Sequence, residues 1–203
     1  MSSISEQLRW DQRYRAGEIL FGEEPSLFLR EQTFRFVPGM KALAVADGQG
    51  RNGVWLACRG LDVLSVDISE TGLQHARELA SRRSVTLQTE CCDLTTWNPP
   101  PGVFDLVVEI SIHFPSEIRR QVHRNLMDAL RPGGLYLVET FHETQCGRAS
   151  GGPKDLDMLS SRVKLQEDFR EFSILELMEG TVLLNEGPRH QGEAWMVRMV
   201  AQK

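Results

Sequence analysis

The stretch LAVADGQGRNGVWLA, residues 43–57, decides the fold of this chain. The small and apolar residues 42–46 are typical of a buried parallel strand. The polar, glycine-rich segment DGQGRNG follows at 47–53, and helical spacing resumes at 54–57. Glycine permits backbone dihedrals closed to other residues and leaves no Cβ between the chain and a ligand. A strand, a glycine turn and a helix start therefore predict a cradle of N–H groups for a small polar ligand.

The composition is that of a soluble globular protein. A length of 203 residues favours one domain, 1–203, and a net charge of −5 argues against a nucleic-acid partner. The first residues lack the pattern of a signal peptide, and no apolar run approaches the roughly 20 residues that span a bilayer. Four cysteines without a C-x-x-C pair favour a reducing compartment and no metal site. We therefore expect a cytoplasmic protein without a membrane partner; the sequence indicates no oligomeric state.

Strands and helices alternate from residue 42 to residue 140. The patterns predict strands at 42–46, 61–66, 85–88, 104–110 and 135–140. Helices are expected up to Cys58, after an N-cap at Ser69 and after an N-cap at Ser116. Such alternation with short loops predicts an α/β fold, a parallel sheet with helices on both faces.

The two ends of the chain depart from this alternation. Trp10 and Tyr14 lie four residues apart in an N-terminal arm, residues 1–36, which they either pin to the core or close over a ligand. Residues 142–164 are polar and rich in Gly and Ser. We expect them to form a lid over a substrate that binds beside the ligand of the glycine turn. The tail predicts strands at 172–178, 182–186 and 194–201, separated by turns that contain glycine.

Acidic residues follow two of the expected strands. Gly48, Gly50 and Gly53 satisfy the spacing G-x-G-x-x-G of a dinucleotide site. Asp67, at the end of the second strand, can accept hydrogen bonds from both hydroxyls of a ribose. Asp93, after the third strand, can accept one from the exocyclic amine of adenine. Together these features predict a pocket for adenosine.

Between residues 41 and 140 the sequence resembles the class I S-adenosylmethionine (SAM)-dependent methyltransferases. The matching stretches are VADGQGRNGVWLA, LSVDIS, CCDL, FDLVVEI and LRPGGLYLVE, in the order of that family. The ends resemble one branch, the small tellurite-resistance-like (TehB-like) methyltransferases. That likeness rests on WDQRY with FGEEPSLFL, on GGPKDLDML and on EGPRHQGEAWMVRMVAQK.

The resemblance implies a Rossmann-like, seven-stranded sheet in the order 3-2-1-4-5-7-6 with strand 7 antiparallel. It implies SAM as the cofactor, with S-adenosylhomocysteine as its product. Gly48 and Gly50 would contact the methionine part, Asp67 the ribose, and Asp93 with Leu94 the adenine. The complete cofactor set that we expect is Trp10, Tyr14, Asp47, Gly48, Gly50, Asn52, Asp67, Ile68, Asp93, Leu94 and Glu109.

Two positions depart from the pattern of the family. The acidic residue usual at the start of the first motif is replaced by Ala44, and the first glycine by Ala46. Asp47 stands where cysteine is frequent. If the usual acid holds the amino group of the ligand, Asp47 or Glu109 must supply that charge here, or the affinity falls.

The resemblance also implies an enzyme that methylates a small-molecule acceptor. A soft acceptor, such as a thiol or a chalcogen oxyanion, needs little help from a base, whereas a hydroxyl or an amine needs one nearby. His113 follows the fourth strand and either contacts the acceptor or is an ordinary loop histidine. Arg189 and His190, in a turn of the tail, either bind an anionic acceptor or order a hairpin. His75 and His123 fall in helices and are expected at the surface.

Two other functions fit parts of the sequence. A non-catalytic SAM-binding protein is one alternative, because the usual acid is missing at Ala44. An NAD-dependent oxidoreductase is less favoured, because the chain leaves little room for a catalytic domain. Neither Tyr14 nor Tyr136 has a lysine four residues later, as the Tyr-x-x-x-Lys pair of such enzymes requires.

Overall fold

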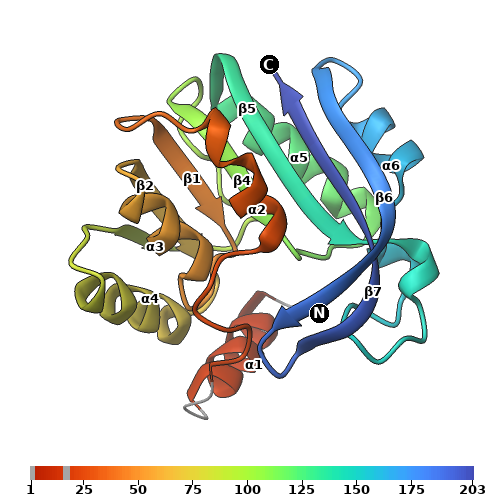
Figure 1. Ribbon diagram of the computed structural model, residues 1–203, viewed down its shortest axis with the longest axis horizontal. Coiled ribbons are helices and arrows are strands. Elements are labelled where there is room, and N and C mark those ends of the chain that lie inside the picture. The colour runs from red at the N-terminus through yellow and green to blue at the C-terminus, as the bar shows by residue number, and fades with distance from the viewer. Residues whose placement is uncertain (1–2, 16–18) are drawn as a thin grey trace. The chain divides into compact units, whose positions relative to one another are not determined.

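The computed structural model describes residues 3–15 and 19–203 (Figure 1). Residues 1–2 and 16–18 of the expected N-terminal arm lie outside the described part. Contacts divide the chain into two compact units, one that ends at Asn98 and one that begins at Pro99. The expectation that residues 1–203 form one domain stays a prediction.

Helices and strands alternate in the first unit and give way to longer strands in the second. The first unit contains α1 (Ser3–Arg15), α2 (Leu27–Glu31), η1 (Gln32–Arg35), β1 (Lys41–Val45), α3 (Arg51–Cys58), β2 (Asp62–Asp67), α4 (Glu70–Arg82) and β3 (Gln88–Cys91). The second contains β4 (Phe104–Ile110), α5 (Ser116–Ala129), β5 (Leu130–Phe141), η2 (Glu143–Gln145), η3 (Leu156–Met158), α6 (Arg162–Asp168), β6 (Ser173–Glu186) and β7 (His190–Gln202).

The strand order confirms the expected fold class. The seven strands follow the order β3-β2-β1-β4-β5-β7-β6. β7 runs antiparallel to both β5 and β6, as the resemblance implies. The protein therefore has the Rossmann-like, seven-stranded sheet that the sequence resemblance implies. No helix in the described ranges is both long and apolar enough to cross a bilayer.

The first unit is built on three parallel strands. β1 pairs with β2, and β2 pairs with β3. Residues 42–45 are buried, as expected of an apolar strand in a parallel sheet. Ser69 caps α4 as predicted, because its hydroxyl oxygen accepts the N–H of Gly72 at 3.1 Å. The apolar stripe of α4 is buried and consists of Leu73, Ala76, Leu79 and Ala80.

The second unit is built on β4 and the long strands that follow it. Every residue of β4 is buried, and β4 pairs with β5 in parallel. β6 and β7 form an antiparallel hairpin. Phe141, at the end of β5, lies in a buried cluster with Leu159 of the expected lid. The remaining buried members of that cluster are Leu184, Ala194 and Met196.

Three local predictions were wrong. The third strand begins at Gln88, not Val85, because the backbone N–H of Val85 bonds to the carbonyl of Ala80 at 3.0 Å. Residues 172–178 and 182–186 form the single strand β6, since Gly180 stays paired with the neighbouring strand and makes no turn. Ser116 does not cap α5; it is the first residue of that helix, and Pro115 is the N-cap.

Gly50 sets how closely α3 approaches α4. It is the N-cap of α3 and has φ +85°. A Cβ at this position would lie 2.6 Å from the Cβ of Ala76 and 2.8 Å from its Cα. Only glycine therefore satisfies both the left-handed turn and the helix contact.

We predict that Gly50→Ala lowers the free energy of unfolding by about 3 kcal/mol, because overpacking adds to the cost of the left-handed conformation. Chemical denaturation followed by circular dichroism measures this loss. Gly39→Ala is the matched control: φ is +89°, but no heavy atom among the described residues lies within 4 Å of its Cβ position. The control should lose only about 1 kcal/mol; equal losses would mean that the contact with Ala76 is unimportant.

Candidate functional site

The glycine turn after β1 is tightly wound. Ala46, Gly48 and Gly50 all have positive φ angles, of 44°, 54° and 85°. The N–H of Gly50 donates to the carbonyl of Asp47 at 2.9 Å, and the N–H of Asp47 donates to Val66 of β2 at 3.1 Å. The turn is thus held against the end of the second strand, directly before the first residue of α3.

Asp67, the last residue of β2, fixes this turn with its carboxylate. Its Oδ2 accepts the N–H of Gly48 at 2.8 Å, and its Oδ1 accepts the N–H of Ser69 at 2.8 Å. Burial raises the pKa of Asp67 to about 6, although these hydrogen bonds oppose the shift. The acid expected to hold a ribose therefore lies beside the glycine turn, as the sequence predicts.

The side chain of Asp47 turns back into the unit. Its Oδ2 accepts the hydroxyl of Ser65 at 2.7 Å, and its two oxygens lie 3.1 and 3.2 Å from the backbone nitrogen of Gly53. Gly53 is in the first turn of α3, so this carboxylate satisfies one of the N–H groups that a helix start leaves without a partner. Burial raises the pKa of Asp47 to about 6. Its predicted contact with a ligand amino group stays a prediction.

The other expected cofactor residues of the first unit lie near the ends of β2 and β3. Asp93 follows β3, and its Oδ1 accepts the N–H of Thr95 at 2.9 Å. Leu94 is buried. The backbone carbonyl of Ile68 accepts the thiol of Cys91 at 3.5 Å, which joins the residue after β2 to the last residue of β3. Asn52 is buried at the start of α3, where its Oδ1 accepts the N–H of Ser26 at 3.0 Å.

α1 packs over the glycine turn and the start of α4, and in Figure 1 it lies beyond the arrowhead of β1. The Oδ1 of Asp11 accepts the hydroxyl of Ser69 at 2.5 Å and the N–H of Thr71 at 3.2 Å. Tyr14 is buried, and a Cβ on Gly48 would collide with its hydroxyl. Trp10 stacks on Tyr14 with ring centroids 5.6 Å apart. Asp67, two residues before the capping Ser69, is only 5% exposed.

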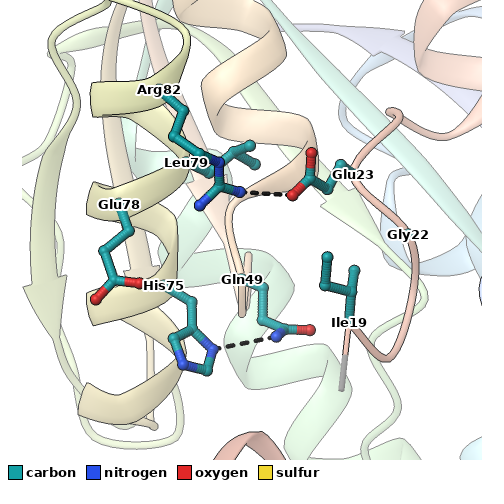
Figure 2. Close-up of a pocket in the computed structure, with 8 residues that line it drawn as sticks. All are labelled: Ile19, Gly22, Glu23, Gln49, His75, Glu78, Leu79 and Arg82. Carbon is teal, nitrogen blue, oxygen red and sulfur yellow. Dashed lines mark hydrogen bonds and ion pairs between the residues drawn. The ribbon is translucent and has the colours of Figure 1, made fainter. Parts of the chain in front are cut away.

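A hollow among the described residues of the first unit lies elsewhere (Figure 2). It has a volume of about 190 Å³. Gln49 reaches it from the glycine turn, and its amide nitrogen lies 3.1 Å from Nδ1 of His75. An ion pair of 2.5 Å joins Arg82 to Glu23 on its wall. Its lining contains none of the expected cofactor residues, so we do not assign the cofactor to it.

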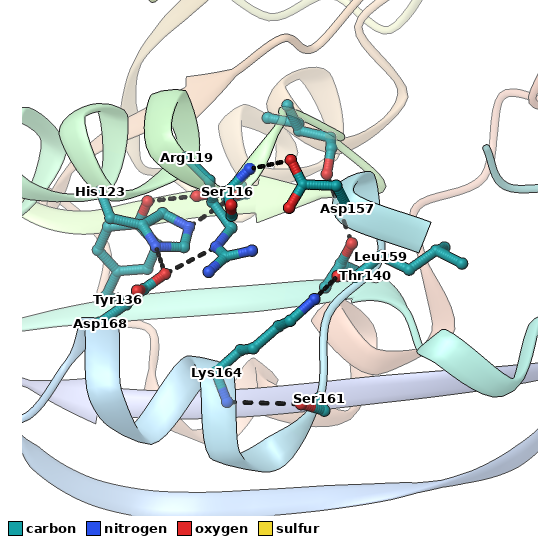
Figure 3. A network of polar contacts seen from close by, with 12 residues as sticks. Ser116, Arg119, His123, Tyr136, Thr140, Asp157, Leu159, Ser161, Lys164 and Asp168 are labelled. Carbon is teal, nitrogen blue, oxygen red and sulfur yellow. Dashed lines mark hydrogen bonds and ion pairs between the residues drawn. The ribbon is translucent and has the colours of Figure 1, made fainter. Parts of the chain in front are cut away.

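Glu109, in β4 of the second unit, belongs to a buried polar network. Figure 3 labels the other members, Arg119, His123, Tyr136 and Asp168. Its carboxylate accepts the hydroxyl of Tyr136 and lies 3.3 Å from Nε2 of His123. Nδ1 of His123 lies 2.9 Å from Oδ2 of Asp168, which also accepts Nε–H of Arg119 at 2.8 Å. Burial alone would lower the pKa of His123, but the two carboxylates outweigh it and raise that pKa to about 9.

This network changes the expectation for two residues. His123 is buried and cationic, so the prediction of a surface histidine was wrong. Both oxygens of Glu109 contact residues of its own unit, which gives that carboxylate a structural task. Arg119 and His123 are four residues apart on α5, and this spacing was the one local sign that they share a face.

The structure brings His113 and His190 to the same aromatic ring. The ring of Phe141 lies 5.5 Å from that of His113 and 5.2 Å from that of His190. Nδ1 of His113 is 3.3 Å from the hydroxyl of Thr140. Burial and the nearby His190 lower the pKa of His113 to about 4, so its imidazole is neutral. Arg189 is exposed on the hairpin turn, next to the buried His190.

Comparison with known proteins finds matches to the part of the chain that contains the glycine turn and the strands after it. Residues 42–134 match the family model described as a methyltransferase domain. The 2-heptyl-1-hydroxyquinolin-4(1H)-one methyltransferase of Mycobacteroides abscessus is 25% identical over 113 residues, which are 54% of this chain and 47% of that protein. The chain thus spans about half the length of this curated relative.

Solved structures share the fold. TehB from Haemophilus influenzae superposes with a TM-score of 0.72 at 20% identity, over 86% of this chain and 61% of the TehB chain. A structure described as "Conversion of a Disulfide Bond into a Thioacetal Group during Echinomycin Biosynthesis" superposes with a TM-score of 0.76 at 17% identity. The match covers 98% of this chain and 92% of the other chain. These likenesses establish the architecture and not the chemistry.

We predict that Glu109→Gln lowers the free energy of unfolding by about 3 kcal/mol, because it leaves the buried His123 cation with one carboxylate fewer. The pKa of His123, measured by NMR titration, should fall below the value of about 9 in the parent protein. Glu117→Gln, at an exposed acid of α5, the helix that carries His123, is the control and should change stability by less than about 0.5 kcal/mol. An unchanged stability of Glu109→Gln would contradict the structural task given to this residue.

Proposed function

We propose that this chain, whose residues 42–134 match the model of a methyltransferase domain, transfers a methyl group from SAM to a small molecule. The likeness to TehB fits the tellurite-resistance-like branch. One observation carries the proposal: the Gly48 N–H and the Asp67 carboxylate meet at 2.8 Å, where the ends of two parallel strands adjoin a helix start. Ligands of open α/β sheets bind at such strand ends.

The residues at these strand ends fit SAM, the methyl donor. Gly48 has no Cβ, and the three heavy atoms nearest to its Cβ position all belong to Tyr14, so a shift of that ring would open the space beside Gly48 to a ligand. We assign Gly48 and Gly50 to the methionine part and Asp67 to the ribose hydroxyls. Asp93, with Leu94, would take the adenine, and Ile68 and Asn52 would complete the pocket wall. SAM, when bound, supplies a methyl group on a positively charged sulfur.

The covering helix must shift for the donor to reach Asp67, since α1 leaves that residue only 5% exposed. We infer that Trp10 and Tyr14 then pack against the donor, so that the helix serves as its cover. We assign Asp47 to bracing the turn, because it joins Ser65 of β2 to Gly53 of α3. We assign Glu109 to the buried network, because it joins His123 to Tyr136.

The low basicity of His113 limits the class of methyl acceptor that we propose. Transfer from a sulfonium is an in-line displacement, to which the protein contributes orientation and the exclusion of water. An imidazole whose pKa is lowered to about 4 is a weak base at neutral pH. This favours an acceptor that is soft or already ionised, such as a thiolate or a chalcogen oxyanion. The protein from M. abscessus is named for a hydroxyquinolone, so an acidic hydroxyl belongs in the same test.

A second candidate is a SAM-binding protein without catalysis. Ala44 in place of the usual acid favours it, as do the occupied carboxylates of Asp47 and Glu109. It shares the donor site with the first proposal and differs only in turnover.

Calorimetry with SAM and S-adenosylhomocysteine tests the donor site, with NADH as the ligand of the rejected oxidoreductase. We predict that SAM affinity rises about tenfold between pH 5 and pH 7.5, because Asp67 ionises near pH 6 and only its carboxylate accepts both ribose hydroxyls. Asp67→Asn should weaken binding and flatten this dependence. Asp62→Asn, at the exposed start of β2, should keep the dependence.

Turnover separates the two candidates. Labelled SAM is incubated with thiols, chalcogen oxyanions, hydroxyquinolones and simple alcohols as acceptors. Methylated product from the first three classes and none from alcohols is the expected result. Binding of SAM with no turnover on any class would favour the non-catalytic protein, and the absence of binding would remove both.

We predict that Tyr14→Ala weakens SAM binding about tenfold, because the donor loses an aromatic cover. Tyr14→Phe should stay close to the parent protein, since the ring is retained. Leu8→Ala, at a half-exposed position of the same helix, is the control. Tighter binding by Tyr14→Ala would mean that this ring only obstructs the site.

A further inference from the structure

The glycine turn carries three polar side chains whose partners lie on another segment. Gln49, Arg51 and Asn52 stand between the glycines of DGQGRNG, and the last two are each only 7% exposed. A buried polar side chain costs free energy unless it is hydrogen-bonded, so its partners indicate its task. Each of the three bonds to the backbone of residues 20–26, which directly precede α2. We call them the clamp residues.

Two of the clamp residues hold the ends of this segment. Oε1 of Gln49 accepts the N–H of Leu20 at 3.0 Å, across 29 residues of sequence. Oδ1 of Asn52 accepts the N–H of Ser26 at 3.0 Å, across 26 residues. Because both contacts are with main-chain atoms, they fix the path of the segment and not only the place of a side chain. The start of α3 therefore determines where the segment runs.

Arg51 holds the residue that supports α1. Its Nη1 donates to the carbonyl of Phe21 at 3.3 Å. The ring of Phe21 lies 6.5 Å from that of Trp10, measured between centroids. Trp10 stacks on Tyr14, and the ring of Tyr14 lies against Gly48. The contacts thus leave the glycine turn through the clamp and return to it through the rings of α1.

His75 of α4 fixes the orientation of the Gln49 amide. Since Oε1 accepts from Leu20, the amide nitrogen faces the imidazole, and it lies 3.1 Å from Nδ1 of His75 (Figure 2). An amide nitrogen only donates, so Nδ1 is the acceptor and the proton of the imidazole is on Nε2. Glu23 of the same segment pairs with Arg82 of α4, but Arg82 is exposed and such a pair contributes little.

We propose that the clamp residues are positioning residues, which hold Phe21 where its ring supports Trp10 over the glycine turn. The helix α1, which must shift for the donor to enter, then returns to the same place, because the clamped segment stays on α3. The effect on the donor rests on the proposed SAM binding. The effect on α1 does not, and it is measured without any ligand.

The first experiment measures amide hydrogen exchange by NMR on the full chain without ligand. Gln49→Ala deletes the acceptor of the Leu20 N–H. The amides of α1 should then exchange about tenfold faster, because the docked position of that helix loses its support. A merely local role would speed exchange at Leu20 alone.

Gln49→Glu is the conservative variant, because its carboxylate can still accept the N–H of Leu20. Its second oxygen faces His75 and needs a donor there, so the imidazole should carry its proton on Nδ1 instead of Nε2. Nitrogen-15 NMR distinguishes these two tautomers. Exchange of the α1 amides should stay near that of the parent protein.

The dissociation of SAM gives the functional measurement. In Gln49→Ala the dissociation rate, followed by stopped-flow fluorescence, should rise about tenfold, since the cover closes less firmly over the donor. The association rate should change by less than about twofold, because the donor enters when α1 is shifted. An unchanged dissociation rate would overturn the part of the proposal that concerns the donor.

A second pair of variants carries the exchange measurement if Gln49→Ala does not fold. Asn52→Ala removes the acceptor of the Ser26 N–H and should also speed exchange of the α1 amides. Asn52→Asp keeps an oxygen at this place and should restore the exchange of the parent protein.

Gln74→Ala is the matched control, since it removes a glutamine of α4 whose amide bonds to Glu78 of the same helix. It should leave the exchange of α1 and the dissociation of SAM unchanged. The proposal is overturned if the α1 amides exchange alike in the parent, Gln49→Ala and Asn52→Ala proteins. Faster exchange in a protein that binds no SAM would keep the clamp and remove the proposed function instead.

Discussion

The contact on which the first unit depends is the hydrogen bond from the Gly48 N–H to the Asp67 carboxylate, at 2.8 Å. It joins the turn after β1 to the last residue of β2, and the same carboxylate also accepts the N–H of Ser69, which caps α4. One buried acid therefore sets the turn and the start of a helix together. Any ligand at these strand ends would meet a surface that is organised before it arrives.

The buried acids of the two units have different partners, and their pKa values shift in opposite directions. In the first, Asp47 and Asp67 are surrounded by backbone N–H groups and a hydroxyl, and burial raises the pKa of each to about 6. In the second, Asp168 lies against Arg119 and His123, and these cations lower its pKa despite burial. Acids held by dipoles can still change their charge near neutral pH, whereas acids held by cations cannot. This contrast favours the first unit for ligand chemistry and the network for structural support.

The sequence predicted those features that depend on interactions between residues close together in the chain. The glycine turn, the Ser69 cap and the apolar strands were visible in the sequence because each depends on residues a few positions apart. The sequence did not predict that Asp157 caps α5, or that His123 lies between two acids, since these pairings join residues 14 to 45 positions apart. The sequence predicted two strands in place of β6, because a lone glycine such as Gly180 indicates a turn. In the structure, pairing with β7 overrides that preference.

The docking of α1 has a consequence for how the chain assembles. Asp11 bonds to Ser69 across 58 residues of sequence, and Tyr14 packs on Gly48 and Gly72. During synthesis this helix therefore leaves the ribosome long before the surface that receives it exists. The amphipathic face of α1 stays exposed until β1, β2 and α4 have formed. Its docking is therefore a late event on the folding pathway.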